Sequence, residues 1–120
     1  MNVLIAENEF ATADSIRRMV ENMGHSTAWA CAGPEALLRL AQEPYQLLIL
    51  SAQLRDADIL QLLPALRRRH PDMPVVAVTS RNSLFLEQQV RQMGVICYLI
   101  KPLDTEELGS IVSHVSIKQA

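Results

Sequence analysis

Hydrophobic and polar positions alternate between two patterns along this chain. Short apolar runs have the pattern of strands buried on both faces, and each run is followed by a stretch with apolar residues at three- and four-residue spacing, as in amphipathic helices. The runs that predict strands are residues 2–6, 25–31, 45–50, 74–79 and 95–100. The stretches that predict helices are residues 9–23, 33–43, 59–69, 84–93 and 104–115.

Glycine and proline mark the helix boundaries. Gly24 and Gly94 follow the first and fourth helical stretches, where a left-handed residue commonly ends a helix. Pro34 stands at the first position of the second helix, where its fixed backbone angle is favourable. Five strands alternating with five helices imply right-handed crossovers and a parallel sheet covered on both faces. The sequence therefore predicts a doubly wound α/β domain, and 120 residues suit one domain over 1–120.

Composition excludes several classes of protein. Hydrophobic residues make up 49% and charged residues 20%, which is ordinary for a globular chain. The net charge of -2 gives no basic footprint for nucleic acid. No run approaches the roughly 20 apolar residues of a membrane span, so we expect a cytoplasmic protein with no membrane contact. Cys31 and Cys97 lie in no metal-binding pattern and are expected to be buried thiols.

Ligands of doubly wound sheets bind outside the carboxyl ends of the strands, near the point where strand order reverses. A candidate site therefore lies among the residues that follow the predicted strands. These residues are Glu7, Asn8, Ser51, Thr79, Ser80 and Lys101.

These strand ends resemble the receiver domains of response regulators. Ala6-Glu7-Asn8-Glu9 stands where the family usually has an acidic pair, and Ser51 stands where the third strand usually ends in the phosphorylated aspartate. Thr79 and Lys101-Pro102 match the family's hydroxyl and Lys-Pro positions, so Pro102 is a candidate cis-proline. The likeness covers essentially the whole chain. It implies a CheY-like, flavodoxin-like (βα)5 fold with strand order 2-1-3-4-5, and a signalling module that is not an enzyme.

The sequence departs from the family pattern at the site itself. Receiver chemistry needs an aspartate that takes the phosphoryl group and carboxylates that hold Mg²⁺. With Ser51 and Asn8 at two of these positions, Glu7 is the remaining carboxylate, and the charge falls from about -3 to about -1. We therefore expect no cofactor and weak or absent Mg²⁺ binding. Glu7 and Lys101 are expected to form a partly exposed ion pair that adds little stability.

Two positions of the resemblance have a plainer interpretation as well. Thr79 is either a residual switch residue or a β-branched residue that ends a strand. Tyr98 matches the family's aromatic switch position, where the ring turns inward when the threonine moves. Because the acceptor is missing, a ring half-buried on an edge strand is the favoured interpretation of Tyr98.

The resemblance and its departures predict an atypical receiver, or pseudo-receiver, in bacterial two-component signalling. It would act without phosphorylation, through a protein partner or as a homodimer. The expected interface is the face of the fourth helix, fifth strand and fifth helix, with Leu84, Phe85, Gln88, Gln89 and Gln92. The first helix, with Phe10 and Arg17, is the competing surface.

Two alternatives remain open from the sequence. Ser51 could act as a non-standard phosphoryl acceptor, although a serine hydroxyl needs an adjacent base. The chain could instead be a flavodoxin-like domain that binds a small ligand, although no glycine-rich phosphate loop follows the first strand.

A basic run at the end of the third helix has its own explanation. Residues 67–70 read Arg-Arg-Arg-His. Cations at a helix C-terminus complement the helix dipole and bond to its free carbonyl groups. We therefore expect a solvated helix end here.

Overall fold

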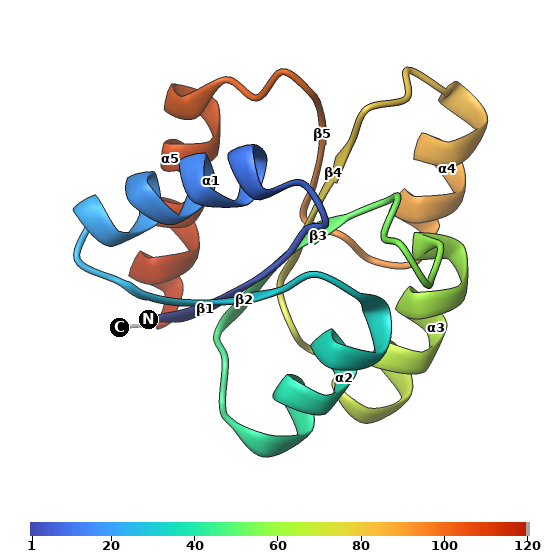
Figure 1. The fold of residues 1–120 in the computed structure, drawn as a ribbon, viewed down its shortest axis with the longest axis horizontal. Coiled ribbons are helices and arrows are strands. Elements are labelled where there is room, and N and C mark those ends of the chain that lie inside the picture. The colour runs from blue at the N-terminus through green and yellow to red at the C-terminus, as the bar shows by residue number, and fades with distance from the viewer. Residues whose placement is uncertain (120) are drawn as a thin grey trace.

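The computed structural model describes residues 1–119 and contains one sheet of five parallel strands in the order β2-β1-β3-β4-β5 (Figure 1). The strands are β1 (Asn2–Ala6), β2 (Ser26–Ala30), β3 (Leu47–Ser51), β4 (Val75–Thr79) and β5 (Cys97–Ile100). The helices are α1 (Phe10–Asn22), α2 (Gly33–Gln42), α3 (Ile59–Arg69), α4 (Leu84–Gln92) and α5 (Thr105–Gln119). The predicted fold class and strand order are confirmed.

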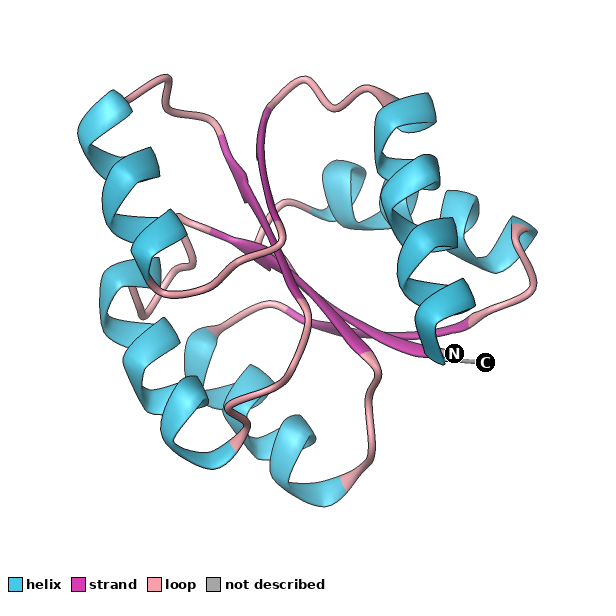
Figure 2. Cartoon of the chain, turned by 180° about the vertical axis from the view of Figure 1, so that it is seen from behind, coloured by secondary structure: helices cyan, strands magenta, loops and turns pink. Residues whose placement is uncertain are grey.

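The helices form two layers, one on each face of the sheet. Helices α1 and α5 cover one face, and α2, α3 and α4 cover the other, as Figures 1 and 2 show from opposite sides. All residues of β3 and β4 are buried, because these central strands have a neighbour on each side and helices on both faces. No helix within residues 1–119 is both long and apolar enough to cross a bilayer.

Side chains and glycines end the helices as their positions predict. Gly24 and Gly94 have positive φ angles of 91° and 86°, the left-handed conformation expected after α1 and α4. The Asp58 carboxylate accepts the backbone N–H of Leu60 at the start of α3. These helix boundaries determine where the loops between strands and helices begin and end.

The prediction that both cysteines are buried was wrong. Cys31 and Cys97 are partly exposed, at the two edges of the sheet where cover is incomplete. Met23 is exposed as well, because α1 ends at Asn22 and the chain turns outward at Gly24. The inner stripe of α3 is centred on Ile59, Leu62, Leu63 and Leu66.

Arg67 joins the end of α3 to the turn between α4 and β5. Its guanidinium donates to the carbonyl oxygens of Met73 at 2.6 Å, Gly94 at 2.9 Å and Met93 at 3.1 Å. The prediction of a solvated helix end was wrong for this arginine, which is partly buried and bonds to carbonyl groups outside its own helix. The next two arginines of the run are exposed.

At Gly33, α2 closely approaches the loop before α3, which leaves no room for a side chain. A Cβ atom at this position would lie 2.7 Å from Ala57 Cβ, too close for two carbon atoms. We expect Gly33→Ala to lower the free energy of unfolding by about 1–3 kcal/mol. Gly109→Ala is the matched control, because its Cβ would lie 3.9 Å from Met19 Sδ. The control should be up to about 1 kcal/mol more stable than the original chain in urea unfolding. Equal effects of the two substitutions would contradict the close approach.

Candidate functional site

The polar residues of the core gather at the carboxyl edge of the sheet. Among residues 1–119, the buried residues with polar or charged side chains are Glu7, Ser51 and Thr79. Ala6 pairs with Leu50 in the sheet, so the next residues, Glu7 and Ser51, lie side by side at the ends of β1 and β3. Buried strands tolerate polar side chains only where these find partners, and the strand ends supply them.

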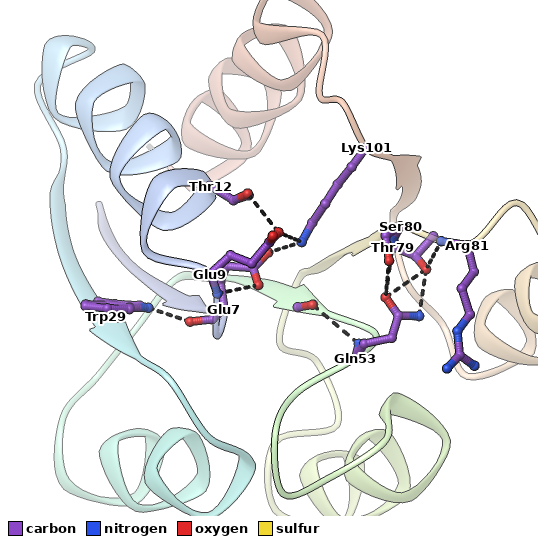
Figure 3. A network of polar contacts seen from close by, with 10 residues as sticks. Glu7, Glu9, Thr12, Trp29, Gln53, Thr79, Ser80, Arg81 and Lys101 are labelled. Carbon is purple, nitrogen blue, oxygen red and sulfur yellow. Dashed lines mark hydrogen bonds and ion pairs between the residues drawn. The ribbon is translucent and has the colours of Figure 1, made fainter.

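Lys101 lies between two glutamates of the loop from β1 to α1 (Figure 3). Its Nζ is 2.5 Å from Glu7 Oε1 and 3.1 Å from Glu9 Oε1. The side chains of Lys101 and Glu7 are 14% and 1% exposed, so the predicted partly exposed pair is a largely buried one. The prediction was wrong because α1 and the loop after β5 close over the strand ends. The close contact with Glu7 is an ion pair, without the angle of a directional hydrogen bond.

Glu9 is a member of this cluster that the sequence analysis did not single out. Its backbone is extended, with φ -88° and ψ 116°, before α1 begins. Alternate residues of an extended segment point to the same side, so Glu7 and Glu9 both reach the ammonium group. This spacing was the available signal in the sequence.

The two carboxylates keep Lys101 charged. Burial alone would lower the Lys101 pKa, but the close contacts with the Glu7 and Glu9 carboxylates and their charges outweigh it and raise the pKa above its ordinary value. The hydrogen bond from Lys101, followed by its charge, lowers the pKa of Glu9. Lys101 is therefore the cation of the cluster, in contact with the carboxyl groups of both glutamates.

Both oxygens of Glu7 face donors. Oε1 meets the Lys101 ammonium group, and Oε2 accepts the backbone N–H of Glu9 at 3.2 Å. In the amide orientation that satisfies its neighbours, Asn8 Nδ2 donates to Oε2 at 2.9 Å and to the Gln53 carbonyl at 3.1 Å. Asn8 therefore presents a donor here, whereas a metal ion needs an acceptor.

Trp29 fixes the same loop from the edge strand β2. Its Nε1 donates to the Glu7 carbonyl oxygen at 2.6 Å, and its ring meets Phe10 edge to face with centroids 5.7 Å apart. The loop from β1 to α1 is thus bonded on both sides, to β2 and to Lys101.

Gln53 links the ends of β3 and β4 and was also missed by the sequence analysis. Its Nε2 donates to Thr79 Oγ1 at 2.8 Å, and its Oε1 accepts the Ser80 N–H at 3.2 Å (Figure 3). Its own backbone N–H donates to Ser51 Oγ at 3.3 Å. No sequence pattern marks a single glutamine in a loop as a site residue, so Gln53 could not be singled out.

Tyr98 is buried beneath α4, so the favoured interpretation of a half-buried ring was wrong. Its residue is 7% exposed and belongs to the same apolar cluster as Leu86 and Val90 of α4. Its hydroxyl has no hydrogen-bond partner in the part of the chain that the structure describes. Burial raises the Tyr98 pKa, and the nearby Thr79 hydroxyl partly opposes this rise.

Mg²⁺ is the ion that receiver chemistry would require, and these residues do not fit it. Such a site needs one or two free carboxylates and open positions for water and phosphate oxygens. Glu7 is occupied by donors, Ser51 is neutral, and Glu9 binds Lys101. Residues 1–119 contain no group of three His, Cys, Asp or Glu arranged to hold a metal ion.

The peptide bond between Lys101 and Pro102 is cis, so the candidate cis-proline is confirmed.

The candidate interface residues lie mainly at the surface. Leu84 and Phe85 begin α4 and are 69% and 68% exposed. Gln88 and Gln92 are exposed and Gln89 is partly exposed, whereas Tyr98 is turned into the core.

The competing surface on α1 carries its own charge pairs. Phe10 is also exposed, and Arg17 pairs with Asp14 and Glu21 on the same helix.

Lys101→Met tests whether the buried Glu7 depends on its cation. Removing one partner leaves a buried, uncompensated carboxylate, so we expect a loss of about 3–5 kcal/mol in the free energy of unfolding. The pKa of Glu9 should rise toward its ordinary value of 4.5, which carboxyl ¹³C NMR measures residue by residue. Lys118→Met on the exposed end of α5 is the matched control. Equal stability of the two variants would show that the cluster is not a buried ion pair.

The response regulator receiver domain family matches residues 3–113. Over 106 residues the chain is 29% identical to the alginate biosynthesis transcriptional regulatory protein AlgB of Pseudomonas aeruginosa, a match that covers 88% of this chain and 24% of AlgB. It is 31% identical over 108 residues to the response regulator MprA of Mycobacterium avium, with 90% of this chain and 47% of MprA covered. The chain thus spans about half or less of the length of these relatives.

Solved structures give the same result. A two-component response regulator from Clostridium difficile superposes with a TM-score of 0.93 at 25% identity, covering 99% of this chain and 98% of that chain. A sensor protein from Polaromonas sp. JS666 superposes with a TM-score of 0.87 at 27% identity, with the same coverage. The family match, which includes all five strands and the greater part of α5, shows that the chain belongs to the response regulator receiver domain family of two-component signalling.

Proposed function

We propose that this receiver domain signals without accepting a phosphoryl group and acts as a protein-interaction module. The observation that carries the proposal is the state of Glu7, whose two oxygens are occupied by Lys101, Asn8 and the Glu9 backbone. The carboxylate and the ammonium group that would serve phosphoryl chemistry neutralise each other instead.

The end of β3 supports the same proposal. Ser51 is buried, and its hydroxyl oxygen accepts the backbone N–H of Gln53. Within residues 1–119, no carboxylate or imidazole is hydrogen-bonded to Ser51 as a base. Because a serine nucleophile needs such a base, the alternative in which Ser51 is the phosphoryl acceptor has less support.

In this proposal the Lys101 ammonium group supplies the positive charge that Mg²⁺ would supply. A strongly hydrated divalent ion would have to displace an internal cation and lose its own water to reach Glu7. The domain is therefore expected to bind Mg²⁺ weakly or not at all.

Gln53 supports a switch region held in one arrangement. Its amide bonds to the Thr79 hydroxyl and the Ser80 N–H, which would otherwise be available to an incoming phosphoryl group. In the receiver pattern the aromatic ring turns inward when the threonine moves, and Tyr98 is inward here. We infer that these loops present the same conformation to a partner without phosphorylation.

The face formed by α4, β5 and α5 is the proposed contact surface. Leu84 and Phe85 expose apolar side chains on α4, and Ile96 and Ile100 do so on either side of the Tyr98 position. Exposed apolar side chains that are this large favour burial against a partner. The partner would be a second copy of the chain or another signalling protein.

An NMR titration tests the loss of phosphoryl chemistry. We expect the amide signals of Glu7, Ser51, Thr79 and Lys101 to stay unshifted on addition of Mg²⁺ and then of beryllofluoride, which imitates a phosphoryl group. The reason is that Glu7 is already saturated by donors. Saturable shifts of these amides at low millimolar Mg²⁺ would overturn the proposal.

The double substitution Asn8→Asp and Ser51→Asp is the positive control for this titration. It returns two carboxylates to the site and removes the Asn8 donor from Glu7, so some Mg²⁺ binding should appear. If the double variant also fails to bind, the loss of charge alone does not explain the missing metal affinity. In that case the contacts of Lys101 with Glu7 and Glu9 are the remaining obstacle.

The contact surface is tested by replacing its apolar side chains. If the domain self-associates through α4, Leu84→Ser with Phe85→Ser should weaken the dimer at least about tenfold, because these side chains would be central to the interface. Sedimentation velocity over a concentration series measures the change. Phe10→Ser on α1 is the matched control, since Phe10 is similarly exposed. A larger effect of Phe10→Ser would move the interface to the first helix.

A further inference from the structure

A groove between α2 and α3 lies on the outer surface, away from the face formed by α4, β5 and α5 (Figure 1). Its volume is about 680 Å³. The α2 wall consists of Pro34, Leu38 and Ala41, all exposed, with Leu38 at 57%. Spacings of four and three residues place them on one side of α2, so this helix presents an apolar stripe outward as well as inward.

The opposite wall is basic. It is formed by Arg68, Arg69 and His70 at the end of α3. Within residues 1–119, neither Arg68 nor Arg69 takes part in a salt bridge, whereas the other arginines of the helices pair with acids or, as Arg67 does, with carbonyl groups. Arg67 is bonded to carbonyl groups outside α3, so the two exposed guanidinium groups of Arg68 and Arg69 are left beside the apolar stripe.

We propose that this groove binds an acidic amphipathic helix of a partner protein. An apolar stripe from Pro34 to Ala41 is about 10 Å long, two turns of helix, which matches the apolar stripe of a short amphipathic helix. The guanidinium groups of Arg68 and Arg69 have the geometry to bind carboxylates with two parallel hydrogen bonds. One wall thus fits the apolar face of the helix, and the other fits Asp or Glu along its flank.

Other occupants fit the groove less well. Nucleic acid or an anionic lipid surface would need more cations than this wall supplies in a chain of net charge -2, and the apolar wall would have no role. A second copy would have to bring an acidic helix. Asp14 and Glu21 of α1, however, are already paired with Arg17 and Arg18 of the same helix. On α5 the acids Glu106 and Glu107 lie in the first turn, whereas its large exposed apolar residue, Ile117, lies near the opposite end.

This surface is separate from the strand ends and from α4. Binding in the groove therefore does not depend on whether the domain accepts a phosphoryl group, and failure of either proposal leaves the other in place.

Synthetic helical peptides provide the test on the full chain. The probe is a stapled peptide of about four turns with leucines on one face and glutamates along one flank, and its match has lysines in place of the glutamates. We expect the acidic peptide to shift the amide NMR signals of α2 and the end of α3 saturably, and the basic peptide to bind at least about tenfold more weakly. Arg68→Glu with Arg69→Glu should reverse this preference, and Leu38→Ser should weaken both peptides.

Two exposed residues of α5 supply the controls. Lys118→Glu reverses the same kind of charge, and Ile117→Ser removes an apolar side chain that is even more exposed than Leu38, so both should leave the affinity within about twofold. The proposal is overturned if the shifts fall outside α2 and α3, if both peptides bind alike, or if the charge reversal has no effect. Binding to anionic vesicles or single-stranded DNA that is lost in the double arginine variant would also overturn the choice of an acidic helix.

Discussion

A carboxylate placed out of contact with water requires partners for its charge and its lone pairs, and Glu7 imposes this requirement on the receiver site. Lys101 crosses from the end of β5 to meet it, and the backbone of Glu9 turns back to donate to it. Trp29 holds the carbonyl of the same residue from β2. The position of the loop from β1 to α1, and so the start of α1, follows from satisfying this one side chain.

The site has two halves, one at the end of β1 and one at the end of β4. On the β1 side, the single cation Lys101 pairs with both Glu7 and Glu9. On the β4 side, Gln53 bonds to Thr79 and Ser80 with neutral groups. In the receiver pattern a phosphoryl group on the third strand would join these halves, because its oxygens reach both the lysine and the hydroxyl. Here Ser51 stands between them and bonds locally to Gln53. The link between the halves is Asn8, whose Nδ2 donates both to Glu7 Oε2 and to the Gln53 carbonyl oxygen.

The alternation of buried runs and amphipathic stretches was enough to predict the sheet, its helices and the edge at which Glu7, Ser51, Thr79 and Lys101 meet. Those features follow from local periodicity and from a rule about strand ends. The burial of the ion pair could not be predicted, because it depends on how α1 and the loop after β5 close over the edge. Gln53 could not be predicted either, since its role comes from the distance between two loops and from no pattern in the chain.

The presence of both Glu7 and Lys101 does not require that the site still performs phosphoryl chemistry. A buried ion pair contributes little net stability compared with apolar residues of the same shape, but removal of one partner leaves an uncompensated buried charge. Each residue is therefore costly to lose while the other remains. Single substitutions at either position are therefore disfavoured, whether or not the domain performs phosphoryl chemistry. Lys101 is thus weak support for retained activity, whereas the donors on both oxygens of Glu7 favour the proposal that the activity is lost.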